Sequence, residues 1–246
     1  MTDLLTKALL RFSKHVPLPH RWSWRIGMRD ELAFWDRYIA ANYAPVKGQA
    51  PTEEGRFRTD PAAPLQDTFC ALLAHVREEK VQILDVGSGP LSRVGKTMPG
   101  KHISLIATDP LAEAYMRLCR KHGVVPPVPP IACDAEELDK HFAPDSFHLA
   151  HANNCLDHAY DPVKAIRNML GLVKPGCHVY LRHEVNVATG ADFVGMHQWN
   201  FRLGPRGEFL VSDRDTTVDM DELLRAEAEI TSHVEGMFVV NIFRKR

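Results

Sequence analysis

The chain has 246 residues, of which 45% are hydrophobic and 25% charged, and its formal net charge is −1. This length and composition predict a globular protein with a substantial core. The near-neutral charge gives no general reason to expect nucleic acid or an anionic membrane as a partner. Membrane insertion is not expected either, because no apolar run approaches the ~20 residues that span a bilayer.

The N-terminal residues 1–20 lack the long apolar core and the small-residue cleavage site of a secretory signal. The five cysteines are widely spaced and contain no CxxC pair, which indicates reduced thiols rather than a zinc site. Both features predict a cytoplasmic protein. No metal is expected, because no cluster of His, Cys and Asp has a recognisable ligand spacing.

Residues 1–64 are predicted to form an N-terminal helical cap and a linker. Asp30 is a candidate N-cap for a helix that runs to about Ala41, with Trp35 and Ile39 on one face. The segment that follows, residues 44–64, is rich in proline, glycine and charge. Such a composition predicts a mobile connection or a lid.

Residues 65–246 alternate between strand and helix patterns. Parallel strands are expected at VQILDV, HISLIAT, PIACD, SFHLAHA and CHVYLRHE, and the runs AEITSHV and MFVVNIF predict an antiparallel hairpin at the end. The fold class is therefore α/β: a Rossmann-like three-layer sandwich with a mostly parallel seven-stranded sheet, beside the N-terminal helical cap. Residues 186–217, before the hairpin, are predicted to be an insertion that the core does not need.

The first of these strands runs into a glycine turn, VQILDVGSGP. One interpretation is a buried strand and a turn without a ligand, since glycine occurs wherever the backbone needs a positive φ. A dinucleotide site would carry a third glycine, and Ser92 stands at that position. Asp85, two residues before Gly87, also suits a positively charged group better than a pyrophosphate. The pattern therefore disfavours a nicotinamide dinucleotide.

Aspartates end three successive predicted strands, at Asp85, Asp109 and Asp134. The carboxyl ends of parallel strands meet at one edge of the sheet, where ligands bind in open α/β folds. A carboxylate at Asp109 can accept hydrogen bonds from both hydroxyls of a ribose, and Asp134 can meet an adenine amino group. These acids favour an adenosine-containing ligand.

Over residues 65–246 the chain resembles class I S-adenosylmethionine-dependent methyltransferases. The matching segments are ILDVGSGP, ATDP, CDAEEL, SFHLAHANNCLDH and LVKPG. The resemblance implies S-adenosyl-L-methionine as the cofactor, with its methionine part at Asp85 and the glycine turn, its ribose at Asp109 and its adenine at Asp134. The implied cofactor set is Asp85, Gly87, Ser88, Gly89, Asp109, Pro110, Asp134, Ala135 and Asn153.

Methyl transfer from a sulfonium is an in-line displacement, and a base is needed only when the acceptor must lose a proton, as a hydroxyl does. Candidate bases at the predicted strand ends are His151, His158, His183 and Glu184, and of these His158, His183 and Glu184 are the catalytic candidates. His158 is equally well interpreted as a helix-entry or cofactor-side contact. His183 and Glu184 are equally well interpreted as polar residues at the end of a strand.

The segment GMHQWNF, residues 195–201, mixes hydrogen-bonding groups with two aromatic rings. His197, Trp199 and Asn200 are candidate acceptor contacts, because aromatic faces pack on sugar rings. The alternative is a loop whose aromatic residues cover the sheet edge. A similar HQWNF stretch occurs in methyltransferases of bacterial glycan and natural-product pathways, which implies a small-molecule or glycan acceptor.

Three functions remain open. The first is methyl transfer to a small molecule or glycan, at a hydroxyl oxygen, with residues 1–64 and 186–217 over the acceptor. The second is an RNA or protein methyltransferase, which the neutral charge disfavours. The third is a non-catalytic protein that binds S-adenosylmethionine. The sequence fixes neither the acceptor nor the oligomeric state.

Overall fold

The computed structural model describes residues 20–43 and 50–246. The expectation that the N-terminus carries no secretory signal falls on residues 1–19, outside the described part, and residues 44–49 of the predicted linker lie outside it as well. No helix within the described ranges is long and apolar enough to cross a bilayer.

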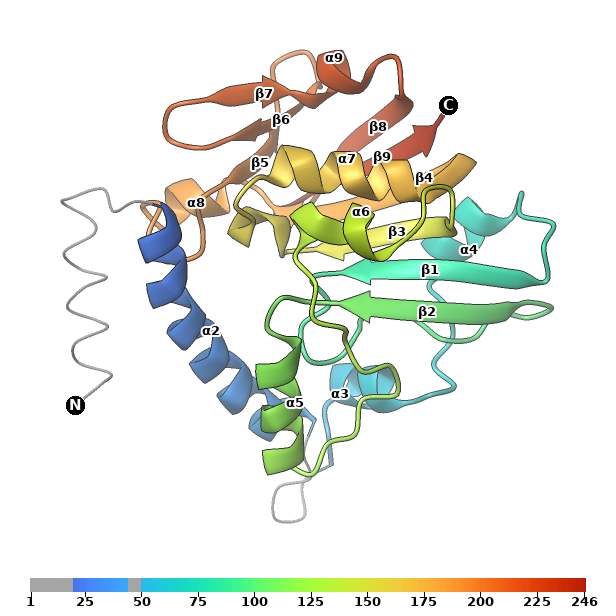
Figure 1. Ribbon diagram of the computed structural model, residues 1–246, viewed down its shortest axis with the longest axis vertical. Coiled ribbons are helices and arrows are strands. Elements are labelled where there is room, and N and C mark those ends of the chain that lie inside the picture. The colour runs from blue at the N-terminus through green and yellow to red at the C-terminus, as the bar shows by residue number, and fades with distance from the viewer. Residues whose placement is uncertain (1–19, 44–49) are drawn as a thin grey trace.

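The larger sheet of the described residues has six strands in the order β2-β1-β3-β4-β9-β8 (Figure 1). Its strands are β1 (Lys80–Val86), β2 (His102–Thr108), β3 (Phe147–Asn153), β4 (Val173–Glu184), β8 (Ala228–Glu235) and β9 (Phe238–Lys245). The first four are parallel, and β9 and β8 are antiparallel. This arrangement confirms the α/β class and the C-terminal hairpin.

The seventh strand, predicted at PIACD, is not formed. Residues 131–133 approach the edge strand β2 through an isolated bridge between Thr108 and Ile131, with hydrogen bonds from Ile131 N to Ala107 O and from Asp109 N to Ile131 O. The run before Ile131 contains Pro126, Pro127, Pro129 and Pro130. Because proline has no N–H to donate, this run cannot extend a hydrogen-bonded ladder. The prediction of seven strands is therefore wrong by this one.

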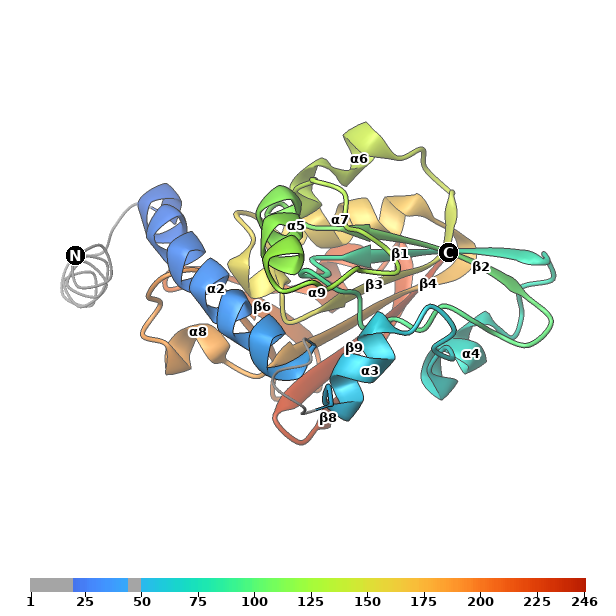
Figure 2. The same ribbon diagram turned by 90° about the horizontal axis from the view of Figure 1, so that it is seen from below.

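Helices cover both faces of the sheet. Figure 2 shows α5 (Ala112–Lys121), α6 (Leu138–His141) and α7 (Pro162–Leu172) on one face, with α3 (Glu53–Thr59) and α4 (Asp67–Leu73) on the other. Helix α7 begins with proline at its first turn, and the carboxylate of Asp161 accepts a hydrogen bond from Lys164 N. Its buried side, Ala165, Ile166 and Met169, joins the core cluster that β1, β3 and β4 share.

Helix α2 (His20–Asn42) lies beyond the carboxyl ends of β1 and β2 (Figure 1). Asp30 stands inside this helix, so its prediction as an N-cap is wrong: the helix already includes His20, ten residues before Asp30. Gly27 lets α2 approach the chain near Met196, since a Cβ at Gly27 would lie 2.6 Å from the Met196 backbone nitrogen. The end of α2 agrees with the predicted end near Ala41 to one residue.

The predicted linker contains helix α3. Thr52 caps this helix by accepting a hydrogen bond from Gly55 N at 3.0 Å. Gly55 packs directly on the end of α2, because a Cβ there would overlap Asn42 O. Arg58, in the last turn, is buried. At least one charged side chain of this segment, that of Arg58, therefore lies in the interior, which the composition of the segment did not indicate.

The predicted insertion, residues 186–217, supplies two strands and the start of the third in a second sheet, whose described strands follow the order β5 (Asn200–Leu203), β6 (Phe209–Ser212) and β7 (Thr217–Asp219). Two short helices flank it, α8 (Val187–Gly190) and α9 (Met220–Leu224). Phe201, Phe209 and Val211 are fully buried and belong to the same core cluster as Phe243 of β9. The expectation that the core does not need this segment is therefore wrong: its inner face completes the core beside β8 and β9.

Candidate active site

A cavity of about 530 Å³ opens at the carboxyl ends of β1 and β3, where the strand order reverses. The chain leaves β1 for β2 on one side and returns to β3 on the other, which is the place where open α/β sheets bind ligands. Every residue of the predicted cofactor set lines this cavity: Asp85, Gly87, Ser88, Gly89, Asp109, Pro110, Asp134, Ala135 and Asn153. The structure thus brings the whole set together.

The turn after β1 requires its glycines. Gly87 and Gly89 have φ of 61° and 65°, a left-handed conformation that side chains rarely adopt. A Cβ at Gly89 would lie 2.8 Å from Cζ2 of Trp35 in α2. The absence of side chains at Gly87 and Gly89 therefore leaves a cradle, and the Trp35 indole packs closely against Gly89.

Asp109 is held in place by backbone groups. Its Oδ2 accepts a hydrogen bond from Gly89 N at 3.0 Å and its Oδ1 one from Leu111 N at 2.8 Å. Burial raises the pKa of this carboxyl to about 7. The carboxyl group is therefore rigidly oriented at the cavity wall, and its protonation changes near neutral pH.

Asp85 lies at the end of β1 directly beside His151 on β3. Its Oδ1 is 2.6 Å from His151 Nδ1, and its Oδ2 accepts a hydrogen bond from Ser92 Oγ at 2.6 Å. Both Asp85 and His151 are buried and line the cavity. His151, a candidate base in the sequence, is thus engaged with Asp85 and stacks on Tyr180.

Helix α2 supplies an aromatic wall that includes one residue of the predicted cap face, Trp35. Trp24, Phe34, Trp35 and Tyr38 all line the cavity. Trp35 Nε1 donates a hydrogen bond to Glu31 Oε1 at 2.8 Å, and the Trp35 ring packs edge-on against Tyr115 of α5. The sequence pattern placed Trp35 and Tyr38 on the helix but gave no sign that they would face a cavity.

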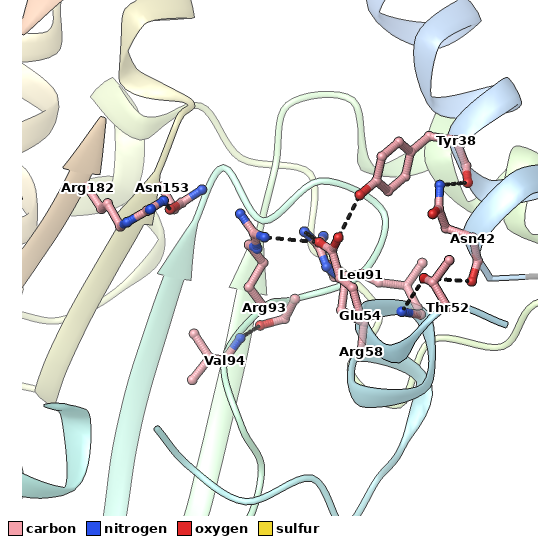
Figure 3. A network of polar contacts seen from close by, with 12 residues as sticks. Tyr38, Asn42, Thr52, Glu54, Arg58, Leu91, Arg93, Val94, Asn153 and Arg182 are labelled. Carbon is pink, nitrogen blue, oxygen red and sulfur yellow. Dashed lines mark hydrogen bonds and ion pairs between the residues drawn. The ribbon is translucent and has the colours of Figure 1, made fainter. Parts of the chain in front are cut away.

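A charged network joins α2, α3 and the loop after β1 (Figure 3). Glu54 Oε2 accepts a hydrogen bond from Tyr38 Oη at 2.7 Å, and Glu54 Oε1 accepts from Arg93 Nη2 at 3.0 Å and from Arg58 Nη2 at 2.5 Å. Arg58 Nη1 also donates to Leu91 O at 3.0 Å. Burial alone would raise the pKa of Glu54, but the hydrogen bond from Tyr38 and the two arginines lower it overall.

Asp157, His158 and His197 converge at the cavity wall. Asp157 Oδ2 lies 2.6 Å from His197 Nδ1 and 3.3 Å from His158 Nε2, and the two ring nitrogens are 3.2 Å apart. Burial would raise the pKa of Asp157, but the charge of His158 and the hydrogen bond with His197 lower it to about 2. Burial lowers the pKa of His197, yet the hydrogen bond and charge of Asp157 give a net upward shift.

Of the remaining predicted residues, the cavity includes Glu184 but not His183. His183 is fully buried beneath the wall, where its Nε2 accepts a hydrogen bond from Leu156 N at 3.2 Å and its ring stacks on Phe201 at 4.3 Å. Burial lowers its pKa to about 4. His183 is therefore unsuited to the predicted role of general base, because a methyl acceptor bound in the cavity would not contact its ring.

Trp199 and Asn200 also lie outside the cavity lining. Trp199 Nε1 donates a hydrogen bond to Ala159 O at 2.9 Å, and the side chain packs on the core. Asn200 is buried, and its side chain bonds to both the backbone and the hydroxyl of Thr189. Trp199 thus packs on the core, and His197 alone of the three predicted acceptor contacts reaches the cavity.

No curated protein matches the chain. By structure, the chain is similar to the CurJ carbon methyltransferase, with 13% identity and a TM-score of 0.49, over 70% of this chain and 50% of that one; it therefore spans half the length of that structure. An S-adenosylmethionine-dependent methyltransferase from Mesorhizobium loti shares 17% identity and a TM-score of 0.42, over 71% of this chain and 96% of that one. A putative S-adenosylmethionine-dependent methyltransferase from Listeria monocytogenes shares 15% identity and a TM-score of 0.45, over 72% and 97%.

Residues 84–181 match the family described as "Methyltransferase domain". The matched range runs from β1 to β4, so it contains the glycine turn and the acids at the ends of β1 and β2, which line the cavity. Residues 84–181 therefore carry the core of a methyltransferase domain.

Proposed function

We propose that the enzyme transfers the methyl group of S-adenosylmethionine to a hydroxyl oxygen of a small molecule or glycan. The observation that carries the proposal is a single cavity that is lined both by the predicted cofactor residues and by the Asp157–His158–His197 cluster. A donor and an acceptor bound in this cavity would lie next to each other. Holding the two reacting atoms at near-attack distance is the main task of such an enzyme.

The residues fit the cofactor. The Gly87–Gly89 cradle would hold its methionine part together with Asp85, and Asp109 would accept hydrogen bonds from the ribose hydroxyls. Asp134 and Ala135 would lie at the adenine and Asn153 below the sulfur. The positive φ of both glycines and the buried, backbone-anchored carboxyl of Asp109 support these roles. When bound, the cofactor supplies a methyl group on a sulfonium.

The walls of the cavity favour a small acceptor with a ring. A volume of about 530 Å³ lies in the range of small-molecule sites. Trp24 and Tyr160 pack together at the cavity with ring centroids 5.2 Å apart, beside the Asp157–His158–His197 cluster. Flat aromatic faces beside imidazole groups suit a molecule that carries both a ring and hydroxyls.

The acceptor proton must leave when a hydroxyl is methylated. The Asp157–His158–His197 cluster offers lone pairs at the cavity wall, and we place deprotonation of the hydroxyl there. His158 thereby keeps the catalytic role expected from the sequence, His197 acts beside it, and Glu184 lies at the same wall. His183 is replaced in this role because it lies outside the cavity.

The cytoplasmic location stays part of this proposal. All five cysteines are free thiols in the structure, which supports a reducing compartment. Cell fractionation with an antibody against the protein tests it.

The function is tested with purified enzyme and methyl-labelled S-adenosylmethionine. A cell extract is separated into small molecules, glycans, RNA and protein, and each fraction is offered as acceptor. We expect label in the small-molecule or glycan fraction, and mass spectrometry of the product should place the methyl group on oxygen. Label that enters only RNA or protein, or a methyl group on nitrogen or carbon, would contradict the proposal.

Two variants sharpen this test. Asp109→Ala should reduce labelling strongly at low cofactor concentration because it weakens cofactor binding. Glu113→Gln, which changes an exposed residue on the neighbouring helix α5 that does not line the cavity, should leave labelling unchanged. Calorimetry with S-adenosylhomocysteine separates the two classes of failure. Cofactor binding without transfer to any fraction would indicate a non-catalytic binding protein.

A further inference from the structure

We propose that Asp157, His158 and His197 bind one divalent transition-metal ion of the zinc type, and that this ion holds the acceptor hydroxyl. The site itself follows from the geometry of the three side chains, and its role in catalysis rests on the proposed function. Within the described residues, these side chains form a group whose possible ligand atoms all lie within 4.8 Å of one another.

The distances match a metal coordination shell. In a tetrahedral site with bonds of about 2.0–2.1 Å to nitrogen and oxygen, neighbouring ligand atoms lie roughly 3.3 Å apart. His158 Nε2 lies 3.2 Å from His197 Nδ1 and 3.3 Å from Asp157 Oδ2. The third edge, 2.6 Å between His197 Nδ1 and Asp157 Oδ2, is a hydrogen bond that must lengthen slightly when an ion enters.

The three ligand atoms face one common point. Asp157 Oδ2 lies within 3.3 Å of both His158 Nε2 and His197 Nδ1, and the two ring nitrogens are 3.2 Å apart. Protons on the two rings would both point at Asp157 Oδ2, whereas a cation at the common point accepts a lone pair from all three atoms.

The ligand segments are held by the surrounding backbone. Asp157 and His158 belong to a single helical turn, η2 (Leu156–His158). The Asp157 carbonyl accepts a hydrogen bond from Gln198 N at 3.0 Å, which ties η2 to the segment that carries His197. Trp24 Nε1 donates to His158 O at 3.1 Å and Trp199 Nε1 to Ala159 O at 2.9 Å. Supports of this kind position metal ligands, and they give the HQWNF segment a role away from direct acceptor contact.

The ligand set indicates the kind of ion. Two imidazole nitrogens and one carboxylate suit zinc and its neighbours among the divalent transition metals better than magnesium or calcium, which prefer oxygen. Three protein ligands leave a coordination position open, as in catalytic rather than structural zinc sites. All three ligands line the cavity, and Glu31 and Glu184 add negative charge to the same walls.

An ion at this point would act on the acceptor. With the ion bound, the lone pairs of the cluster are occupied as ligands, so the cluster promotes deprotonation through the metal and does not accept the proton itself. A hydroxyl bound to a divalent metal has a lowered pKa and loses its proton to solvent more readily. The resulting oxygen attacks the methyl carbon, an oxygen–carbon bond forms, and the carbon–sulfur bond breaks to leave a neutral thioether. This inference replaces the sequence expectation of no metal. Asp157 and His197 are 40 positions apart in the sequence, so the ligands do not form a recognisable sequence motif.

The test uses the full chain without a histidine tag, stripped of metal with a chelator and then freed of the chelator. Co²⁺ is titrated while its visible absorption is recorded, and Zn²⁺ is titrated by calorimetry. We expect one equivalent of each ion, with the intense visible bands of four- or five-coordinate cobalt. Asp157→Asn, His158→Gln and His197→Gln should each weaken binding at least tenfold. His233→Gln, which changes an exposed histidine that contacts Glu235 on the same strand, β8, should not.

Cofactor binding is measured on the same samples, which separates this inference from the proposed function. S-adenosylhomocysteine should bind the stripped wild type and all four variants, which also shows that each variant is folded. Absence of stoichiometric binding by the wild type, or binding that all three cluster variants retain, overturns the metal site and leaves the methyltransferase proposal standing. Stoichiometric metal binding without methyl transfer to any hydroxyl overturns the proposed acceptor chemistry instead.

Discussion

The carboxyl group of Asp109 accepts a hydrogen bond from the backbone N–H of Gly89 at 3.0 Å, and this bond links the end of β2 to the glycine turn after β1. The sequence predicted the glycine turn and the acid for a ribose as two separate parts of the cavity. The hydrogen bond joins them, so the position of one depends on the other. A change at Asp109 acts on both at once.

We expect Asp109→Asn to weaken the binding of S-adenosylhomocysteine. The amide has one oxygen, so either Gly89 N or Leu111 N loses its acceptor, and the proposed ribose contact loses a charge. Loss of charged hydrogen bonds of this kind costs about 1–3 kcal/mol, or roughly tenfold to hundredfold in affinity. Isothermal titration calorimetry measures the difference, and equal affinity would show that Asp109 does not hold the cofactor.

The affinity of the wild type for S-adenosylhomocysteine should rise with pH through neutrality. Burial raises the pKa of Asp109 to about 7. Below this value the group is protonated and is a weaker acceptor for ribose hydroxyls, so affinity is lost as pH falls. Titrations at about pH 6 and about pH 8 should therefore differ more for the wild type than for Asp109→Asn, which lacks this titration. Parallel pH profiles would contradict the assignment.

His183 should contribute to acid denaturation rather than to the pH profile of catalysis. Burial depresses its pKa from 6.5 to about 4. A group with a depressed pKa adds stability that is present above the unfolded value and is lost as pH falls towards the folded value. The full effect is about 3 kcal/mol, as an order of magnitude.

His183→Gln tests this role. The variant should be less stable than the wild type at about pH 8, because it loses the ring stacked on Phe201. The gap in unfolding free energy should narrow at about pH 5, since the variant has no histidine to protonate at this site. Urea denaturation at both pH values measures the gap. A gap of constant size would show that His183 does not titrate in this window.

The fold was predictable from the sequence because its signals are local. Buried parallel strands give continuous apolar runs, as in β1, where Val81, Ile83 and Leu84 are fully buried. The convergence of the predicted cofactor residues was predictable for a related reason: residues at the carboxyl ends of neighbouring parallel strands share one sheet edge. The prediction that Asp85 and Asp109 lie at the same edge therefore required no information about long-range packing.

The other walls of the cavity were not predictable in the same way. Glu54 and Arg58 lie in a segment with the composition of a solvated linker, and only the packing of α3 against α2 turns them inward. Asp157 and His197 meet because the chain crosses back over η2 after β4. Contacts of this kind join segments that share neither a helix nor a pair of hydrogen-bonded strands. They therefore produce no periodic pattern of hydrophobic residues in the sequence. His183 shows the opposite error, since a polar residue near a strand end was buried instead of exposed to the cavity.

Trp199 and Trp35 should behave differently when each is changed to phenylalanine. Trp199→Phe removes the hydrogen bond to Ala159 O and should lower the unfolding free energy by about 1 kcal/mol. It should leave S-adenosylhomocysteine affinity within about 0.5 kcal/mol, because Trp199 does not line the cavity. Trp35→Phe, at the wall over Gly89, should weaken that affinity several-fold. Loss of cofactor binding by folded Trp199→Phe would contradict this division.

Glu54→Gln should destabilise the fold through Arg58. The buried guanidinium of Arg58 has Glu54 as its charged partner, and the neutral amide leaves that charge uncompensated. Because the Glu54 side chain is 33% exposed, solvent screens part of the loss, and we expect a decrease of about 1–3 kcal/mol in unfolding free energy. Glu53→Gln is the matched control, since Glu53 is the exposed neighbour on the same turn of α3. Chemical denaturation compares the two variants. Equal stability of both would mean that water replaces Glu54 as the partner of Arg58, and that α3 is held to the cavity wall by its backbone contacts alone.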